Sequence, residues 1–120
     1  MWKKIAASAL LVLAIPISSA SASPFWYLGT WNMGAPSHCG GLSWCGFVAN
    51  NVLRDAGMNP TQQGRDLVTG DHGDTAVIVL CTPTSSSTIA AAVMAISNNS
   101  HNAESWRNRI RDGMQARHCL

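Results

Sequence analysis

The sequence predicts an α+β protein, in which residues 23–120 form a single two-layer domain stapled by disulfides. Three observations lead to this fold class: two segments have amphipathic helical spacing, apolar β-branched segments lie between them, and four cysteines fall in this part of the chain. The predicted order is β-α-β-β-β-α. The economical two-layer arrangement for that order is an antiparallel sheet with both helices on one face.

The first 22 residues have the three parts of a cleavable signal peptide. Lys3 and Lys4 supply the positive start, Ile5 to Ile17 is almost entirely apolar, and Ala20-Ser21-Ala22 matches the small-x-small cleavage pattern. The apolar stretch is shorter than the roughly 20 residues that span a bilayer. We therefore expect a mature chain that begins near Ser23, has no transmembrane segment and is periplasmic or secreted.

The charge of the mature chain excludes one class of partner. Lys3 and Lys4 leave with the signal peptide, and the six arginines that remain are balanced by six acidic residues. The mature net charge is therefore zero with histidines neutral. Because nucleic-acid binders carry a basic excess, no nucleic-acid partner is predicted. The length suits one domain with one modest core.

The first half of the domain reads as a strand, a loop and a helix. Phe25 to Asn32 is rich in aromatics and predicts the first strand. Asn32 to Gly41 holds three glycines and a proline, which indicates a loop. Ser43 to Ala56 predicts a helix with Ser43 as its N-cap, and Gly57 is placed to stop it. Its apolar residues recur at three- and four-residue spacing: Cys45, Val48, Ala49, Val52, Leu53 and Ala56.

Three strands and a turn are predicted in the second half. Gln62 to Thr69 reads as a polar, exposed strand, and Gly70 to Asp74 as a turn by composition. Thr75 to Thr82 is the clearest strand, because its centre is continuous, apolar and β-branched. Thr88 to Ser97 is a second apolar stretch, which pairs most simply with the one before it.

The last predicted element is a helix from Ala103 to Gln115. Trp106, Ile110 and Met114 fall on one stripe of that helix, which predicts that this stripe is buried. Its other faces carry three arginines, which are expected to be solvated: Arg107, Arg109 and Arg111.

The four cysteines of the exported domain predict two disulfides. Cys45 lies on the apolar stripe of the first helix and Cys81 ends the most hydrophobic strand, so we expect these two to pair. Cys39 and Cys119 lie outside the predicted elements and become neighbours if the two helices lie side by side. The alternative, Cys39 with Cys45 and Cys81 with Cys119, stays open.

A metal site is the competing interpretation of two of these cysteines. His38-Cys39 and His118-Cys119 form matching pairs, and four such groups suit tetrahedral zinc. Adjacent side chains diverge, however, so they rarely ligate one metal together. A disulfide is therefore favoured, and no metal or other cofactor is predicted.

One resemblance covers most of the mature chain. The pattern resembles a group of small secreted bacterial proteins of unknown function, in which one helix cysteine and one strand cysteine recur. It implies a compact α+β domain with no established activity. The residues that carry it are Cys45, Ala49, Leu53, Gly57, Gly70, Gly73, Asp74, Val79, Leu80, Cys81 and Ala103.

A second resemblance is local. Ser43 to Val48, with Leu53, Ala56 and Gly57 after it, resembles the nucleophile helix of CHAP-type and related papain-like cell-wall amidases and endopeptidases. That likeness implies Cys45 as the nucleophile, activated at a helix end. It implies His72 as the base, with His101 as a second choice.

The rest of the chain departs from that enzyme pattern. The family carries its histidine inside a strand, whereas the turn composition around His72 predicts a loop. A free Cys45 also leaves three cysteines, of which one is unpaired, in an oxidising compartment. A structural Cys45 is therefore the favoured interpretation.

The sequence therefore favours a non-catalytic binding or interaction module of the cell envelope, whose partner is an envelope protein or polymer. Two alternatives remain open. One is a cysteine amidase or endopeptidase that acts on peptidoglycan through Cys45 and His72. The other is an inhibitor or immunity-type protein for an envelope enzyme. The oligomeric state is left open.

Overall fold

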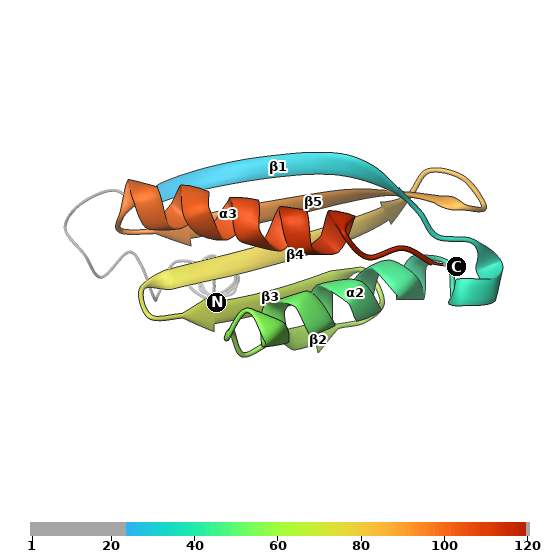
Figure 1. Ribbon diagram of the computed structural model, residues 1–120, viewed down its shortest axis with the longest axis horizontal. Coiled ribbons are helices and arrows are strands. Elements are labelled where there is room, and N and C mark those ends of the chain that lie inside the picture. Colours follow the sequence, from blue (N-terminus) through green and yellow to red (C-terminus); the bar gives the residue numbers. More distant parts are fainter. Residues whose placement is uncertain (1–23, 120) are drawn as a thin grey trace, which may run out of the picture.

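The computed structural model describes residues 24–119, which form a five-stranded antiparallel sheet with two helices on one face (Figure 1). The predicted signal peptide, residues 1–22, lies outside the described residues. The elements are β1 (Phe25–Gly34), the 3-10 helix η1 (Ser37–Cys39), α2 (Leu42–Asp55), β2 (Thr61–Gln63), β3 (Leu67–His72), β4 (Thr75–Pro83), β5 (Thr88–Ser97) and α3 (Ser100–Gln115).

The sheet has the order β1-β5-β4-β3-β2, so the first strand in the sequence pairs with the last. β1 and β5 run side by side over ten residue pairs, from Phe25 opposite Ser97 to Gly34 opposite Thr88. β5 and β4 form the centre of the sheet. Helix α3 contacts β1, β5 and β4, while α2 contacts mainly β4 and β3 (Figure 1). The predicted α+β class and two-layer arrangement are confirmed.

The predicted strand order is wrong at one place, because a single strand over residues 62–69 is in fact a hairpin. β2 and β3 pair through Thr61 opposite Thr69, and Gly64 lies in the turn with a φ of 74°. A glycine adopts that left-handed conformation without steric cost. The predicted turn over residues 70–74 is also too long. β3 continues to His72, and a two-residue turn that includes Gly73, with a φ of 58°, leads into β4.

The two helices begin earlier than predicted. α2 has Gly41 rather than Ser43 at its N-cap, whereas the predicted stop at Gly57 is confirmed by its φ of 94°. α3 begins at Ser100, because the side chain of Asn99 accepts a hydrogen bond from the backbone N–H of Asn102 at 3.0 Å. That cap satisfies one of the amide groups left free at a helix start.

The core lies between the helices and the sheet. Leu53 of α2 and Ile110 and Met114 of α3 are fully buried against the inward valines of the strands. The helices approach closely, since a Cβ atom at Gly113 would lie 2.8 Å from Cγ1 of Val52. Trp106 was expected in this core, but it is only half-buried at its margin.

Residues 24–119 contain two disulfides, and both predicted pairings are confirmed. Cys45–Cys81 joins α2 to β4, and Cys39–Cys119 joins η1 to the end of the chain, each with a Cα–Cα distance of 6.2 Å. The alternative pairing is not adopted. Disulfides are typical of proteins outside the reducing cytoplasm. Within residues 24–119, no helix has the length and apolar character needed to cross a membrane.

Candidate binding face

Alternate residues along each strand point away from the helices. In β4, Val77 and Val79 are buried against the helices, while the intervening Ile78 and Leu80 face the other way. The same alternation runs through β1, β5 and β3, because successive side chains of a strand point to opposite sides. The sheet therefore has a second face, which we call the outer face.

The outer face is apolar at its centre and at Trp26 and Leu28 of the edge strand β1, and most of the rest of its margin is polar. None of the described helices lies on it, since both cover the opposite side of the sheet (Figure 1). Its apolar members are Trp26 and Leu28 of β1, Ala90, Ala92, Met94 and Ile96 of β5, Ala76, Ile78 and Leu80 of β4, and Leu67 of β3. Its polar members are Thr30, Asn32, Thr61, Gln63, Thr69, Asp71, Thr82 and Thr88.

The strand register arranges these side chains in rows across the sheet. One row runs Trp26–Ile96–Ala76–Asp71, from β1 to β3. Three of the large apolar side chains on this face are well exposed, Trp26 by 61%, Leu28 by 50% and Leu80 by 45%. Ile78, Met94 and Ile96 are half-buried between their neighbours. Scattered exposed apolar residues are ordinary, but a contiguous group of them marks an interaction site.

The outer face has the size of an interface. Its long strands have nine or ten residues, and five strands lie side by side. At about 3.3 Å per residue and 4.8 Å between strands, the sheet covers roughly 600 Å² in projection. Standard protein interfaces bury about 800 Å² of accessible surface on each partner. The extent of the sheet is therefore on the scale of one side of a specific interface.

A hollow of about 250 Å³ interrupts the outer face on its β3 side. Ile78 and Ile96 form its apolar wall, while Thr69 and Asp71 supply polar groups. Trp26 protrudes at the opposite side of the sheet, on the same row as Asp71. The face therefore carries a projecting aromatic ring and a recess on opposite sides of one row.

Charge is nearly absent from the outer face, because Asp71 is its single ionisable side chain within the described strands. The arginines of α3 lie on the helix side instead, and several of them have partners within the fold. Arg111 pairs with Asp112 at 3.1 Å, and Arg117, which follows the helix, pairs with Asp55 of α2 at 2.7 Å. The guanidinium of Arg109 lies 5.0 Å from the ring centre of Trp106.

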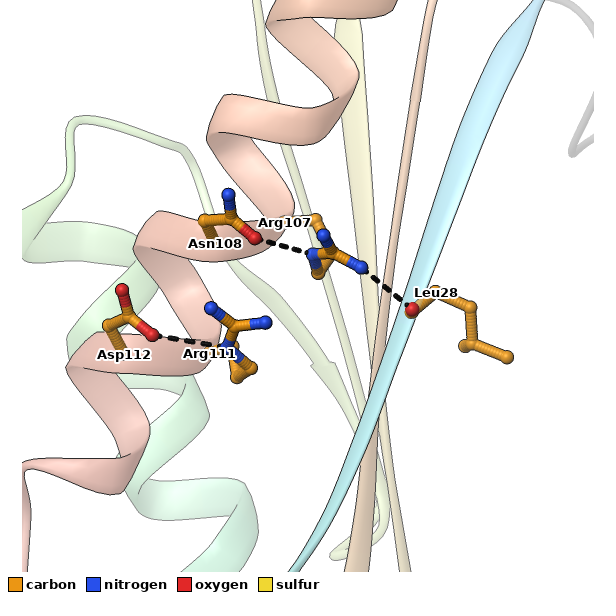
Figure 2. A network of polar contacts seen from close by, with 5 residues as sticks. All are labelled: Leu28, Arg107, Asn108, Arg111 and Asp112. Atoms are coloured by element: carbon orange, nitrogen blue, oxygen red, sulfur yellow. Dashed lines mark hydrogen bonds and ion pairs between the residues drawn. The ribbon is translucent and has the colours of Figure 1, made fainter.

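Arg107 has a structural role that the sequence did not indicate. Figure 2 shows its side chain reaching from α3 to β1, where Nη1 donates to the backbone carbonyl of Leu28 at 2.9 Å. The Nε group donates to Asn108 Oδ1 at 2.7 Å. Gly29 leaves room for this contact, since a Cβ atom there would lie 3.0 Å from Cδ of Arg107. Arg107 thus occupies a backbone carbonyl of the edge strand β1. Such coverage limits the pairing of an open strand edge with other chains.

The residues proposed for a cysteine hydrolase do not form that site. Cys45 is bonded to Cys81 and fully buried, so its sulfur has no thiolate form in this structure. His72 lies at the end of β3 rather than in a turn. Its Nδ1 atom lies 3.3 Å from the carbonyl of Gly57, and its ring lies 5.4 Å from that of Trp106. His101 is exposed in the first turn of α3.

The group considered for zinc is only partly assembled. His38, Cys39 and Cys119 lie together, with their potential ligand atoms within 4.8 Å of one another. Nε2 of His38 is 3.7 Å from the sulfur of Cys119. His118 is not part of this group. Because the two cysteines form a disulfide, the thiolates of a tetrahedral site are not present.

Compared with known proteins, the chain matches no family model, and none of the curated proteins matches it either. On the geometry of the described residues, the outer face is the main candidate site. An apolar face of the sheet that the helices leave uncovered was not predicted from the sequence. The signal was nevertheless present. The continuous apolar residues of β4 and β5, without hydrophobic–polar alternation, are typical of strands that are covered on both faces.

Proposed function

We propose that this chain is an exported, non-catalytic interaction module of the cell envelope, and that it binds a protein partner through its outer face. The observation that carries the proposal is the apolar centre of that face, which no described element covers. Burial of such a surface is favourable by about 25 cal/mol per Å² of apolar area. Trp26 and Leu28 are the strongest contributors, because more than half of the first and half of the second are exposed.

The chemistry of the face favours a protein over a wall polymer. A polysaccharide or peptidoglycan strand presents hydroxyl and amide groups, which need hydrogen-bonding partners when they are desolvated. The centre of the outer face offers alanine, isoleucine, methionine and leucine side chains instead. A partner protein that presents its own apolar side chains meets no unpaired polar groups there.

Two further observations support export and a binding role. The predicted signal peptide and the two disulfides both fit a periplasmic or secreted protein. Cys45, the nucleophile of the hydrolase alternative, is held in a buried disulfide. The inhibitor alternative is one form of the same proposal, in which the partner on the outer face is an enzyme.

Site-specific photo-cross-linking in the producing cell tests the proposal. A photoreactive phenylalanine analogue replaces Leu28 on the outer face or, as the matched control, Phe47 on α2. Phe47 is also apolar and 57% exposed, but it lies on the helix side. We expect protein adducts from position 28 and few from position 47. Equal labelling at both positions, or no adduct at position 28, contradicts the proposal.

A further inference from the structure

We infer that the partner on the outer face is a second copy of this chain, related to the first by a two-fold axis that runs parallel to the strands. This inference rests on the proposed function and names its partner. Two sheets packed face to face lie about 10 Å apart, with their strands within about 30° of each other. The outer face has features on opposite sides that fit each other under that symmetry.

The first feature is a projection and the second is a recess. Trp26 projects from β1, at one side of the sheet. The hollow of about 250 Å³ lies at the other side, and residues of β5, β4, β3 and β2 line it. Trp26 belongs to the register row that runs Trp26–Ile96–Ala76–Asp71. The hollow spans that row and the next one, which contains Ile78 and Thr69, so the two features differ mainly in position across the sheet.

The symmetry follows from that row. β5 and β4 are the middle two of the four strands β1, β5, β4 and β3. A two-fold axis between them, parallel to the strands, places β1 of each copy over β3 of the other and leaves every row where it was. Trp26 of each copy then lies over the hollow of the other. The contact is isologous, since the same pair of features meets twice.

Charge and area agree with a second copy. In this arrangement the two Asp71 carboxylates lie on opposite sides of the interface, so no like charges meet across it. The apolar centre is bordered by threonine, asparagine and glutamine, which matches the polar rim of protein interfaces. The projected area of roughly 600 Å² is on the scale that a stable dimer buries on each partner.

Sedimentation of the chain that begins at Ser23 tests the inference. We expect twice the mass of one chain, with association that depends on concentration. Trp26→Glu and Leu28→Asp should weaken association at least about tenfold, as loss of an aromatic or apolar anchor does. Phe47→Asp, which makes the same kind of change on the helix side, should leave the dimer intact. A monomeric wild-type chain, or equal losses for all three variants, overturns the inference.

A charge exchange tests the specific arrangement. Residue 26 is expected to lie over the hollow that holds Asp71, so Trp26→Glu places two carboxylates together twice per dimer. Adding Asp71→Lys to Trp26→Glu converts each repulsion into an attraction. The double variant should therefore regain at least part of the association that Trp26→Glu loses. A double variant as weak as the single one contradicts the two-fold arrangement.

The mass of the photo-adduct at position 28 separates the two proposals. An adduct of two chains supports the second copy. An adduct with a different protein, from a chain that sediments as a monomer, removes the second copy but leaves the proposed function. Absence of any adduct with another chain contradicts both proposals.

Discussion

The two faces of the sheet are built from the same strands but have different fates. On the inner face, Val77, Val79 and Val93 are completely buried under α2 and α3. On the outer face, the neighbouring Leu80 remains 45% exposed. β4 and β5 are apolar on both sides, however, which is the composition of strands with two covered faces. The two faces therefore differ in what covers them among residues 24–119, although the strands that build them are apolar on both sides.

The faces also differ in shape. On the inner side of β5, Ile89 and Val93 belong with the small Ala91 and Ala95 to the core cluster that includes helix residues. On its outer side, Ala90 and Ala92 keep one half of the sheet surface low, whereas Met94 and Ile96 are larger. Interdigitated packing suits a permanent core. A low surface with one projection and one recess suits docking of a separate body.

The largest expected difference between the faces comes from adjacent residues of β4. Val79→Asp places an unpaired charge in the core and should prevent folding, because such burial costs more than about 4 kcal/mol. Leu80→Asp places the same carboxylate on the outer face and should cost the monomer about 1 kcal/mol or less. Urea unfolding of both variants measures the difference. Similar losses would show that the outer side of β4 is packed like the inner one.

Removal of the buried disulfide tests how strongly the helix layer is held on the inner face. The double substitution Cys45→Ala and Cys81→Ala should lower the free energy of unfolding by about 4 kcal/mol, as the chain-entropy model gives for a loop of this length. The bridge spans 36 residues and lies in the core. Denaturant unfolding under non-reducing conditions measures the loss. A loss below about 1 kcal/mol would mean that packing alone holds α2 on the sheet.

Two residues of α3 compare the centre of the inner layer with its margin. Ile110 is fully buried, so Ile110→Ala should cost about 3 kcal/mol. Trp106 is half-buried and contacts the ring of His72 and the guanidinium of Arg109, so Trp106→Ala should cost clearly less. Thermal and urea unfolding of the two variants rank them. The reverse ranking would place Trp106 inside the core.

The smallest expected effect concerns the edge that joins the two faces. Arg107→Met removes the hydrogen bond to the carbonyl of Leu28 and should cost about 1 kcal/mol. Arg109→Ala is the control, because that side chain has only its contact with Trp106 to lose, and it should cost less than about 0.5 kcal/mol. Equal costs would show that Arg107 does not stabilise the edge of β1.

Local patterns predicted the fold class and both disulfides. Continuous β-branched residues identified β4, and helical spacing placed Cys45 on the buried side of α2 opposite Cys81. These features depend on periodicity and burial, which a sequence carries directly.

Features that depend on distant contacts were not predictable in the same way. In the β2–β3 hairpin, β2 has only three residues, all polar, so hydrophobic periodicity does not mark where it ends and the turn at Gly64 begins. The half-burial of Trp106 depends on its contact with His72 at the end of β3, and the contact of Arg107 depends on β1, 79 residues away. The hollow of the outer face is lined by residues of β2, β3, β4 and β5, so it exists only once these four strands are in register.

The proposed coverage of the outer face can be measured residue by residue. Methyl NMR of the chain from Ser23, with a soluble paramagnetic probe, measures this directly at Ile78, Met94 and Ile96. We predict that these methyl groups become protected as the protein concentration rises, and that Trp26→Glu exposes them again. Coverage of the outer face would be contradicted if these methyl groups stayed fully accessible to the probe at every protein concentration, and also after addition of any partner captured at position 28.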